Sequence, residues 1–367
     1  MSFDTLPTEI AASVVKNVRQ ALPSRRCVRK LTASKITRPT DLKNLERLEL
    51  SHILLKYGNR TYLQIVDFAG LTSLTLSNCP WSTEFLRHLN QQFRIRSPAL
   101  KHLRYEAETV HSAVIAEFLG SLTGLVTLHV SVESLSMDYR DVLVDAVQLH
   151  ALTLQDLLLR RSWKVIQNKI QSFSTQMVKL RQLGVALPEI STQDAELGEW
   201  GEYGDAIAAI AAAPRLTLLR LLSWPNPPAH EFEGLMTVPS PVDDEDDDYD
   251  YNFAFDIDVK VAPITNRIFA TIMDDFATNL MRYIESRVPG KPCPTLVFGT
   301  RDRNDPVDST GVRRKVKPTA YIPGKQMDKF GQVHRVAIRT EPRLLKYVDP
   351  EMDEVATKWL DDRAEAA

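Results

Sequence analysis

The sequence predicts an α/β fold in which short strands and helices alternate along the chain. One observation is a pattern that recurs between residues 45 and 221: leucine, two variable residues, leucine, one variable residue and a third apolar residue. Another is that apolar residues lie three or four positions apart between the copies, which is the spacing of one helix face. Because strand side chains alternate between two faces, we expect the leucines of each copy to form the core.

Six copies of the pattern are almost evenly spaced. Their first leucines follow one another at intervals of 25 to 29 residues, as in leucine-rich repeats. A seventh copy follows a longer gap, and a degenerate copy lies near residue 293. The copies are Leu45-Leu48-Leu50, Leu71-Leu74-Leu76, Leu100-Leu103-Tyr105, Leu125-Leu128-Val130, Leu154-Leu157-Leu159, Leu180-Leu183-Val185, Leu216-Leu219-Leu221 and Cys293-Leu296-Phe298.

These repeats predict a leucine-rich-repeat solenoid. A single strand–helix unit cannot bury its own apolar face, so the units stack, with a curved parallel sheet on the concave side and the helices on the convex side. Cys79, at the ninth position of the second copy, is predicted to tie down the turn rather than to act as a nucleophile. An ordinary α/β domain with leucine-rich strands is the alternative, because strand–helix alternation is common to both.

Composition divides the chain into five predicted regions. Residues 226–263 are rich in proline and include the acidic run from Asp243 to Asp250, which repels itself and predicts a disordered insertion. The regions are a short helical segment at 1–40, leucine-rich repeats at 41–225, the acidic insertion at 226–263, degenerate terminal repeats at 264–340 and a C-terminal tail at 341–367.

Charge and cysteine content restrict the partners and the compartment. The 367 residues have a net charge of −2, so neither a nucleic acid nor a membrane partner is expected. No apolar stretch approaches the roughly 18 residues of a membrane-spanning helix, and the first residues lack the features of a signal peptide. Cys27, Cys79 and Cys293 are far apart, which favours an intracellular, reducing compartment, the cytoplasm or the nucleus.

The usual catalytic and cofactor motifs are missing from the sequence. It has no Gly-x-Ser-x-Gly elbow, no phosphate-binding loop, no Gly-x-Gly-x-x-Gly and no His-Glu-x-x-His. The eight histidines are scattered without the spacing of metal ligands. We therefore predict a non-catalytic protein with no cofactor and no metal, and an enzyme on an α/β scaffold is the alternative.

A helix is predicted at the N-terminus. Asp4 or Thr5 can cap it, Pro7 occupies a first-turn position where no N–H is needed, and Glu9 favours the helix dipole. One apolar stripe follows, formed by Leu6, Ile10, Val14 and Val18.

The opening Leu6-Pro7-x-Glu9-Ile10 and this stripe resemble the first helix of an F-box, and with the repeats the whole chain resembles fungal-type F-box and leucine-rich-repeat proteins. Members of that family are substrate receptors of cullin-type ubiquitin ligases: the F-box binds a Skp-family adaptor and the repeats bind the target. The resemblance implies adaptor contacts at Leu6, Pro7, Glu9, Ile10 and Val14. The repeats begin at Leu45, which leaves less room than a complete box needs. A truncated F-box, or a helix that only caps the solenoid, is the alternative.

The target is expected on the concave face of the sheet, at strand positions that alternate with the core leucines. These positions are Glu46, Arg47, Glu49, Thr72, Ser73, Thr75, Lys101, His102, Arg104, Val126, Thr127 and His129. Nothing in the sequence identifies the protein that they bind.

Overall fold

A computed structural model describes residues 46–51, 55, 68–95, 99–110, 112–135, 140–160, 175–188, 190–225, 254–299, 319–341 and 345. The predicted adaptor contacts Leu6, Pro7, Glu9, Ile10 and Val14 lie outside these residues, as do the acidic run and most of the C-terminal tail. The chain divides into two compact units. Unit 1 comprises Met1–Ala186 and Ala213–Leu216, and unit 2 comprises Leu187–Ala212 and Thr217–Ala367.

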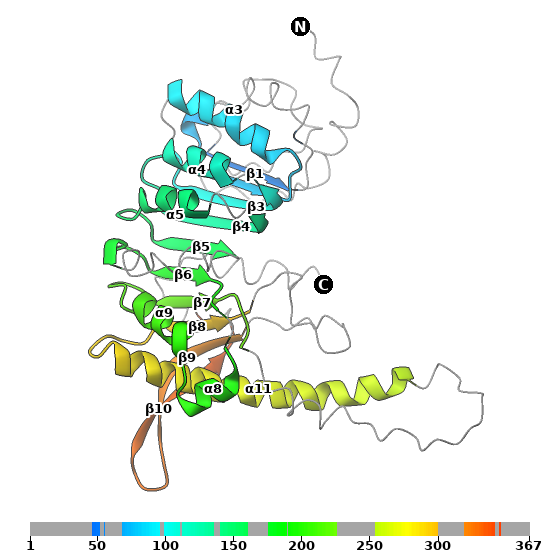
Figure 1. Ribbon diagram of the computed structural model, residues 1–367, viewed down its shortest axis with the longest axis vertical. Helices are drawn as coiled ribbons and strands as arrows, with labels where there is room; N and C mark the ends of the chain where they lie inside the picture. Colours follow the sequence, from blue (N-terminus) through cyan, green and yellow to red (C-terminus); the bar gives the residue numbers. More distant parts are fainter. Residues whose placement is uncertain are drawn as a thin grey trace, which may run out of the picture. The chain divides into compact units, whose positions relative to one another are not determined.

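Unit 1 is a parallel sheet with helices between its strands, so the prediction of an α/β fold is confirmed for it (Figure 1). The strands lie in sequence order and neighbouring strands are parallel. They are β1 (Arg47–Ser51), β2 (Ser73–Ser77), β3 (His102–Val110), β4 (Thr127–Leu135), β5 (Asp156–Arg160) and β6 (Gln182–Val185). The helices are η4 (Phe68–Gly70), α3 (Ser82–Ile95), α4 (Ser112–Gly120) and α5 (Arg140–Gln148).

The leucines of successive copies are aligned across this sheet. Leu74 pairs with Leu48 on one side and with Leu103 on the other, and the same position continues through β6. None of the residues in this row is more than 6% exposed: Leu48, Leu74, Leu103, Leu128, Leu157 and Leu183. One row of the core of unit 1 is therefore made by leucine at the same position of each copy.

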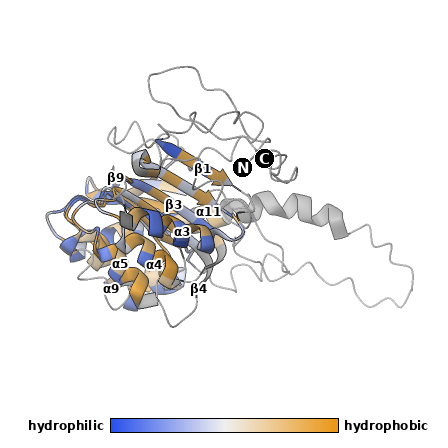
Figure 2. Cartoon of the chain, turned by 90° about the horizontal axis from the view of Figure 1, so that it is seen from above, coloured by the Kyte–Doolittle hydropathy of each residue, from blue (hydrophilic) through white to orange (hydrophobic). Residues whose placement is uncertain are grey.

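Helices α3, α4 and α5 pack in succession (Figure 1). Phe93 of α3 meets Phe118 of α4, with 5.7 Å between the ring centroids. Leu143 and Val144 of α5 are also buried. In the hydropathy colouring of Figure 2, β1, β3 and α4 each contain both apolar and polar residues. Helix α3 thus buries the apolar stripe that its spacing predicted, whereas in α5 the predicted Val142 is exposed and Leu143 is buried in addition to Val144 and Val147.

A carbonyl ladder links neighbouring copies through the residue that follows each first leucine. The Glu46 carbonyl accepts the N–H groups of Thr72 and Ser73, at 2.8 and 3.0 Å. The Thr72 carbonyl in turn accepts those of Lys101 and His102, again at 2.8 and 3.0 Å. The same double contact recurs at the carbonyls of Lys101, Val126 and Gln155. Because a carbonyl oxygen has two lone pairs, it accepts both hydrogen bonds, and every copy enters its strand in the same way.

Cys79 lies where the repeat pattern placed it, beneath the turn after β2. Its side chain is 3% exposed, and its thiol lies 3.4 Å from the Leu50 carbonyl oxygen of the preceding copy. A thiol is a weak donor, so this contact adds to the packing of the turn.

Unit 2 begins as a repeat and ends as a hairpin. Strands β7 (Leu218–Leu221) and β8 (Thr295–Phe298) are parallel, with Leu219 opposite Leu296. The Thr295 N–H donates to the Thr217 carbonyl at 2.8 Å, as in the carbonyl ladder. However, β9 (Thr319–Met327) is antiparallel to β8, and β10 (Val333–Thr340) is antiparallel to β9. The prediction of a wholly parallel sheet is therefore wrong for these last strands.

The described helices of unit 2 are α8 (Thr192–Leu197), α9 (Gly201–Ala211) and α11 (Ala254–Arg287), and α11 packs against both others. Helix α11 thus begins within residues 226–263, for which composition predicted a disordered insertion. Trp200 stacks near Tyr283 of α11, with ring centroids 4.9 Å apart. A Cβ atom on Gly204 would lie 2.6 Å from the Tyr283 hydroxyl oxygen, so the absence of a side chain there permits this approach.

Among the described residues, none of the helices is long and apolar enough to cross a membrane.

Replacing Leu128 with alanine is expected to lower the free energy of unfolding by about 2–5 kcal/mol, because its side chain is fully buried and a cavity would remain. Urea denaturation monitored by circular dichroism measures the change. Leu149→Ala is the matched control, since Leu149 is 70% exposed and its truncation should change the free energy by less than about 0.5 kcal/mol. Equal losses in both variants would contradict the proposed core.

Candidate functional site

The second face of the unit 1 sheet is lined by the residues between the core leucines. The strand register arranges them in three rows. One row contains Arg47, Ser73, His102, Thr127, Asp156 and Gln182; the next contains Glu49, Thr75, Arg104, His129, Leu158 and Gly184; the third contains Ser51, Ser77, Glu106 and Ser131. We call these three rows the polar face.

The structure brings most of the predicted target contacts together on the polar face. Arg47, Ser73, His102 and Thr127 are neighbours in the first row, and Glu49, Thr75, Arg104 and His129 are neighbours in the second. Glu46, Thr72, Lys101 and Val126 instead precede the strands, where their carbonyls form the ladder. These four residues lie at the entry to the strands, outside the three rows.

Exposure differs across the predicted residues. Glu46, Arg47, Glu49 and Lys101 are exposed, whereas Thr72, Thr75, His102, Arg104 and Val126 are partly buried. Ser73, Thr127 and His129 are buried, at 9%, 5% and 6% exposure. Alternation in the strand therefore predicted the direction of these three side chains but not their accessibility. A partner would meet the exposed residues, while the buried ones support their neighbours.

A buried histidine–carboxylate pair joins two strands of the polar face. His129 Nε2 lies 2.9 Å from Asp156 Oδ2, and both side chains are at most 9% exposed. An ionised carboxylate only accepts hydrogen bonds, so His129 donates through Nε2. This contact fixes the tautomer of a neutral imidazole and orients its ring.

Further contacts cross the neighbouring strands. The Ser77 hydroxyl donates to Glu106 Oε2, and Arg104 Nη2 lies 3.6 Å from the same oxygen. His102 Nδ1 lies 3.1 Å from the Thr127 hydroxyl oxygen. Arg104, Glu106, His129 and Asp156 are thus held by their neighbours, which fixes the positions of their donors and acceptors on the polar face.

Sequence reasoning missed Asp156, Glu106 and Ser77. Asp156 occupies the same position in the fifth copy as Thr127 in the fourth, so the repeat pattern could have found it. Glu106 and Ser77 lie one step beyond the third apolar residue of their copies, and β2 and β3 extend far enough to include them. These two residues belong to the polar face because β2 and β3 continue past the third apolar residue of the repeat, and the repeat pattern does not show how far a strand extends.

The described residues contain no cluster of three or more His, Cys, Asp or Glu side chains that could hold a metal ion. Burial raises the pKa of the Cys293 thiol to about 12, so it remains protonated at neutral pH. Burial likewise raises the pKa of Tyr105 to about 12, and its hydroxyl forms a 2.7 Å hydrogen bond with that of Ser82. Both groups are therefore neutral parts of the packing at neutral pH.

No protein-family model matches this chain, and no curated protein matches it.

Replacing Asp156 with alanine is expected to lower the free energy of unfolding by about 1–3 kcal/mol, because His129 would lose the partner of a buried donor. Urea denaturation of Asp156→Ala, His129→Ala and the double variant isolates the contribution of the pair. The exposed Asp275 of α11 provides the control substitution Asp275→Ala. Purely additive effects of the two single changes would show that the contact contributes no coupling energy.

Proposed function

We propose that this chain is a non-catalytic leucine-rich-repeat protein that binds another protein through the polar face. The observation that carries the proposal is the aligned repeat: core leucines in one row across six strands, joined by the carbonyl ladder. In a solenoid of this kind the sheet lines the concave side, where a partner contacts several copies at once.

The chemistry of the polar face supports a protein as the target. Arg47 and Glu49 are exposed on one strand, and Arg104 and Glu106 lie two copies away. Because both signs of charge occur together, the surface suits a partner with its own mixed charges more than a polyanion. The contacts of Glu106 with Ser77 and Arg104 hold the second of these pairs before binding, which lowers the entropy lost in the complex.

The role that best joins this surface to the N-terminal resemblance is that of a substrate receptor of a cullin-type ubiquitin ligase. The F-box-like segment at 1–40 would bind the Skp-family adaptor, and the polar face would hold the target. Support for the adaptor comes from the resemblance of Leu6, Pro7, Glu9, Ile10 and Val14 to the start of an F-box.

A leucine-rich-repeat scaffold without a ligase role is the second candidate. Its supporting observation is the basic stretch from Arg25 to Lys30, which is poor in the apolar residues that the further helices of an F-box would bury. In this case the N-terminal helix would serve as a cap for the first repeat.

Full-length protein is expected to retain a purified Skp-family adaptor in a pull-down, and a variant lacking residues 1–40 should lose it. The double variant Leu6→Ala, Ile10→Ala should also lose it, because the implied contacts are apolar. Circular dichroism provides the control that the repeats of each variant stay folded. If full-length protein does not retain the adaptor, the ligase role is excluded and the scaffold role is favoured.

Target binding is expected to require the exposed charges of β1. A photoreactive residue at position 49 should cross-link the target in cells, whereas the same residue at the exposed Gln92 of α3 should not. With the identified target purified, the double variant Arg47→Glu, Glu49→Lys should weaken binding by about tenfold or more in calorimetry. Cross-linking from position 92 but not from position 49 would place the target on the helix side and contradict the proposed surface.

A further inference from the structure

The hairpin of unit 2 carries an exposed apolar tip. Met327 ends β9, Val333 begins β10, and Phe330 lies between them in the turn. These three side chains are 67%, 58% and 76% exposed. Single exposed apolar residues are common on protein surfaces, but three large ones within seven residues form a patch. In Figure 1 this hairpin extends away from the other strands of unit 2.

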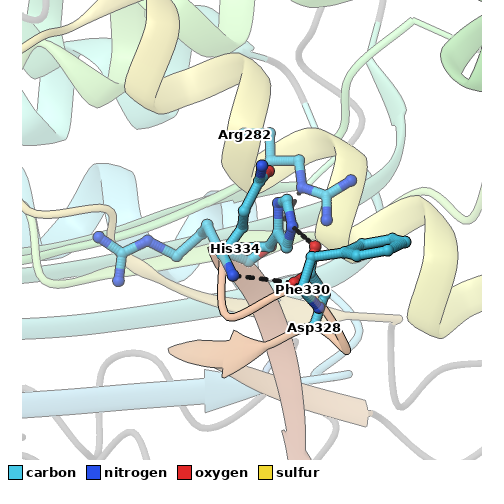
Figure 3. Close-up of polar contacts among 6 residues, drawn as sticks. Arg282, Asp328, Phe330 and His334 are labelled. Carbon is cyan, nitrogen blue, oxygen red and sulfur yellow. Dashed lines mark hydrogen bonds and ion pairs between the residues drawn. The ribbon is translucent and has the colours of Figure 1, made fainter.

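A single carboxylate holds the turn in shape (Figure 3). Asp328 Oδ1 accepts the backbone N–H groups of Phe330 and Gln332, both at 2.8 Å. Its other oxygen, Oδ2, accepts a 2.8 Å hydrogen bond from His334 Nε2. The hydrogen bonds from His334 and Gln332 hold the pKa of Asp328 below its ordinary value. The carboxylate is therefore ionised at neutral pH and its charge is directed into the turn.

Backbone contacts complete the turn. The Asp328 N–H donates to the Gln332 carbonyl at 2.8 Å, and the Gly331 N–H donates to the Asp328 carbonyl at 3.0 Å. Gly331 has a φ of +80°, a conformation that glycine adopts without strain. Phe330 is thus presented by a defined turn rather than by a loose loop.

Helix α11 covers backbone groups along the rest of the hairpin. Arg282 Nε donates to the Arg335 carbonyl at 3.0 Å, and the Thr278 hydroxyl accepts from the Ala337 N–H at 3.1 Å. Arg339 also pairs with Asp274 of α11, at 2.8 Å. Open backbone groups on an edge strand favour pairing with a strand of another protein. In β10 the Arg335 carbonyl and the Ala337 N–H are already bound by α11, so we expect a partner to contact the side chains of the tip instead.

The charge around the tip is positive. Lys325 and Lys329 are exposed, and the Lys329 ammonium lies 5.0 Å from the centroid of the Phe330 ring. Asp328 offsets one of these two charges, so Lys325, Lys329 and Asp328 together leave the tip with one net positive charge. The tip therefore presents an aromatic side chain with the Lys329 ammonium beside it.

We propose that the hairpin tip of residues 327–333 is a second protein-binding site, in which Phe330 enters an apolar pocket of a partner protein whose rim carries carboxylates. Aromatic side chains dominate the binding energy of many interfaces, and a turn fixed beforehand loses little entropy on binding. A lipid bilayer has no shape to match, so it gains little from a fixed turn. The tip belongs to unit 2 and the polar face to unit 1, and this proposal does not depend on the ligase role.

The experiment uses the full-length protein. A photoreactive residue at position 330 is expected to cross-link one protein in cells, and the same residue at Gln326 on β9 should not. The cross-linked protein is then identified, purified and used as the probe in calorimetry. Phe330→Ala should weaken its binding by about tenfold or more, and Phe330→Leu should retain most of the affinity. Lys329→Glu should weaken binding most at low salt, because it reverses a charge at the rim.

Two variants test the role of the turn itself. Asp328→Ala keeps Phe330 but removes the acceptor of two N–H groups, so it should weaken binding. Asp328→Asn keeps an oxygen that can accept them and should restore part of the affinity. The matched control is Leu197→Ala in α8, which truncates an exposed apolar residue of the same unit, 66% exposed, and should leave binding unchanged.

Other results would overturn the proposal. One is cross-linking at position 330 that does not exceed that at position 326. Another is an unchanged affinity for the probe in Phe330→Ala. A third comes from co-sedimentation with vesicles of phosphatidylcholine and phosphatidylserine at a ratio of about 7:3, which carry an anionic surface. Sedimentation of the wild type but not of Phe330→Ala would assign the tip to a membrane instead.

Discussion

The double hydrogen bond to one carbonyl in each copy is the contact on which the rest of unit 1 depends. Because two consecutive N–H groups of the next copy bind the same oxygen, that copy has one way to enter its strand. A slip of one residue would turn every leucine to the opposite face of the sheet. The carbonyl ladder therefore keeps Leu74 opposite Leu48 and Leu103, and the buried leucine row follows from it.

Once the register is fixed, the two faces of each strand differ in polarity and in burial. In unit 1 the leucine face is apolar, and the other face carries charges that its neighbours hold in place. In unit 2 the corresponding second-face residues Leu218, Val297 and Ala320 are apolar, and they pack with Leu345, which is fully buried. Unit 2 thus packs its own residues against a sheet face that carries polar side chains in unit 1, so the proposed binding surface is confined to unit 1.

The sequence predicted the strands and core leucines well because each copy contains the whole pattern within six consecutive residues. Helix α11 begins at Ala254, inside the segment 226–263 for which composition predicted disorder, and it contains Pro263. Strand β9 was not predicted, since Pro323 and Gly324 interrupt its pattern and its pairing with β10 joins residues on opposite sides of a turn. The burial of Ser73, Thr127 and His129 was also not predicted. Alternation along a strand shows which face a side chain points to, but it does not show which residues of other strands cover it.

The two proposed binding sites are held in shape by different means. On the polar face, side-chain contacts among the four strands β2, β3, β4 and β5 hold the surface, and the carbonyl ladder fixes the sheet beneath them. At the hairpin tip, one carboxylate holds two N–H groups and His334, with no sheet beneath the turn. Removing one member of the buried network leaves its partner unsatisfied, so such a change lowers the stability of the sheet itself. Asp328 is instead partly exposed and holds only the turn, so a change there acts on the shape of the tip rather than on a buried core.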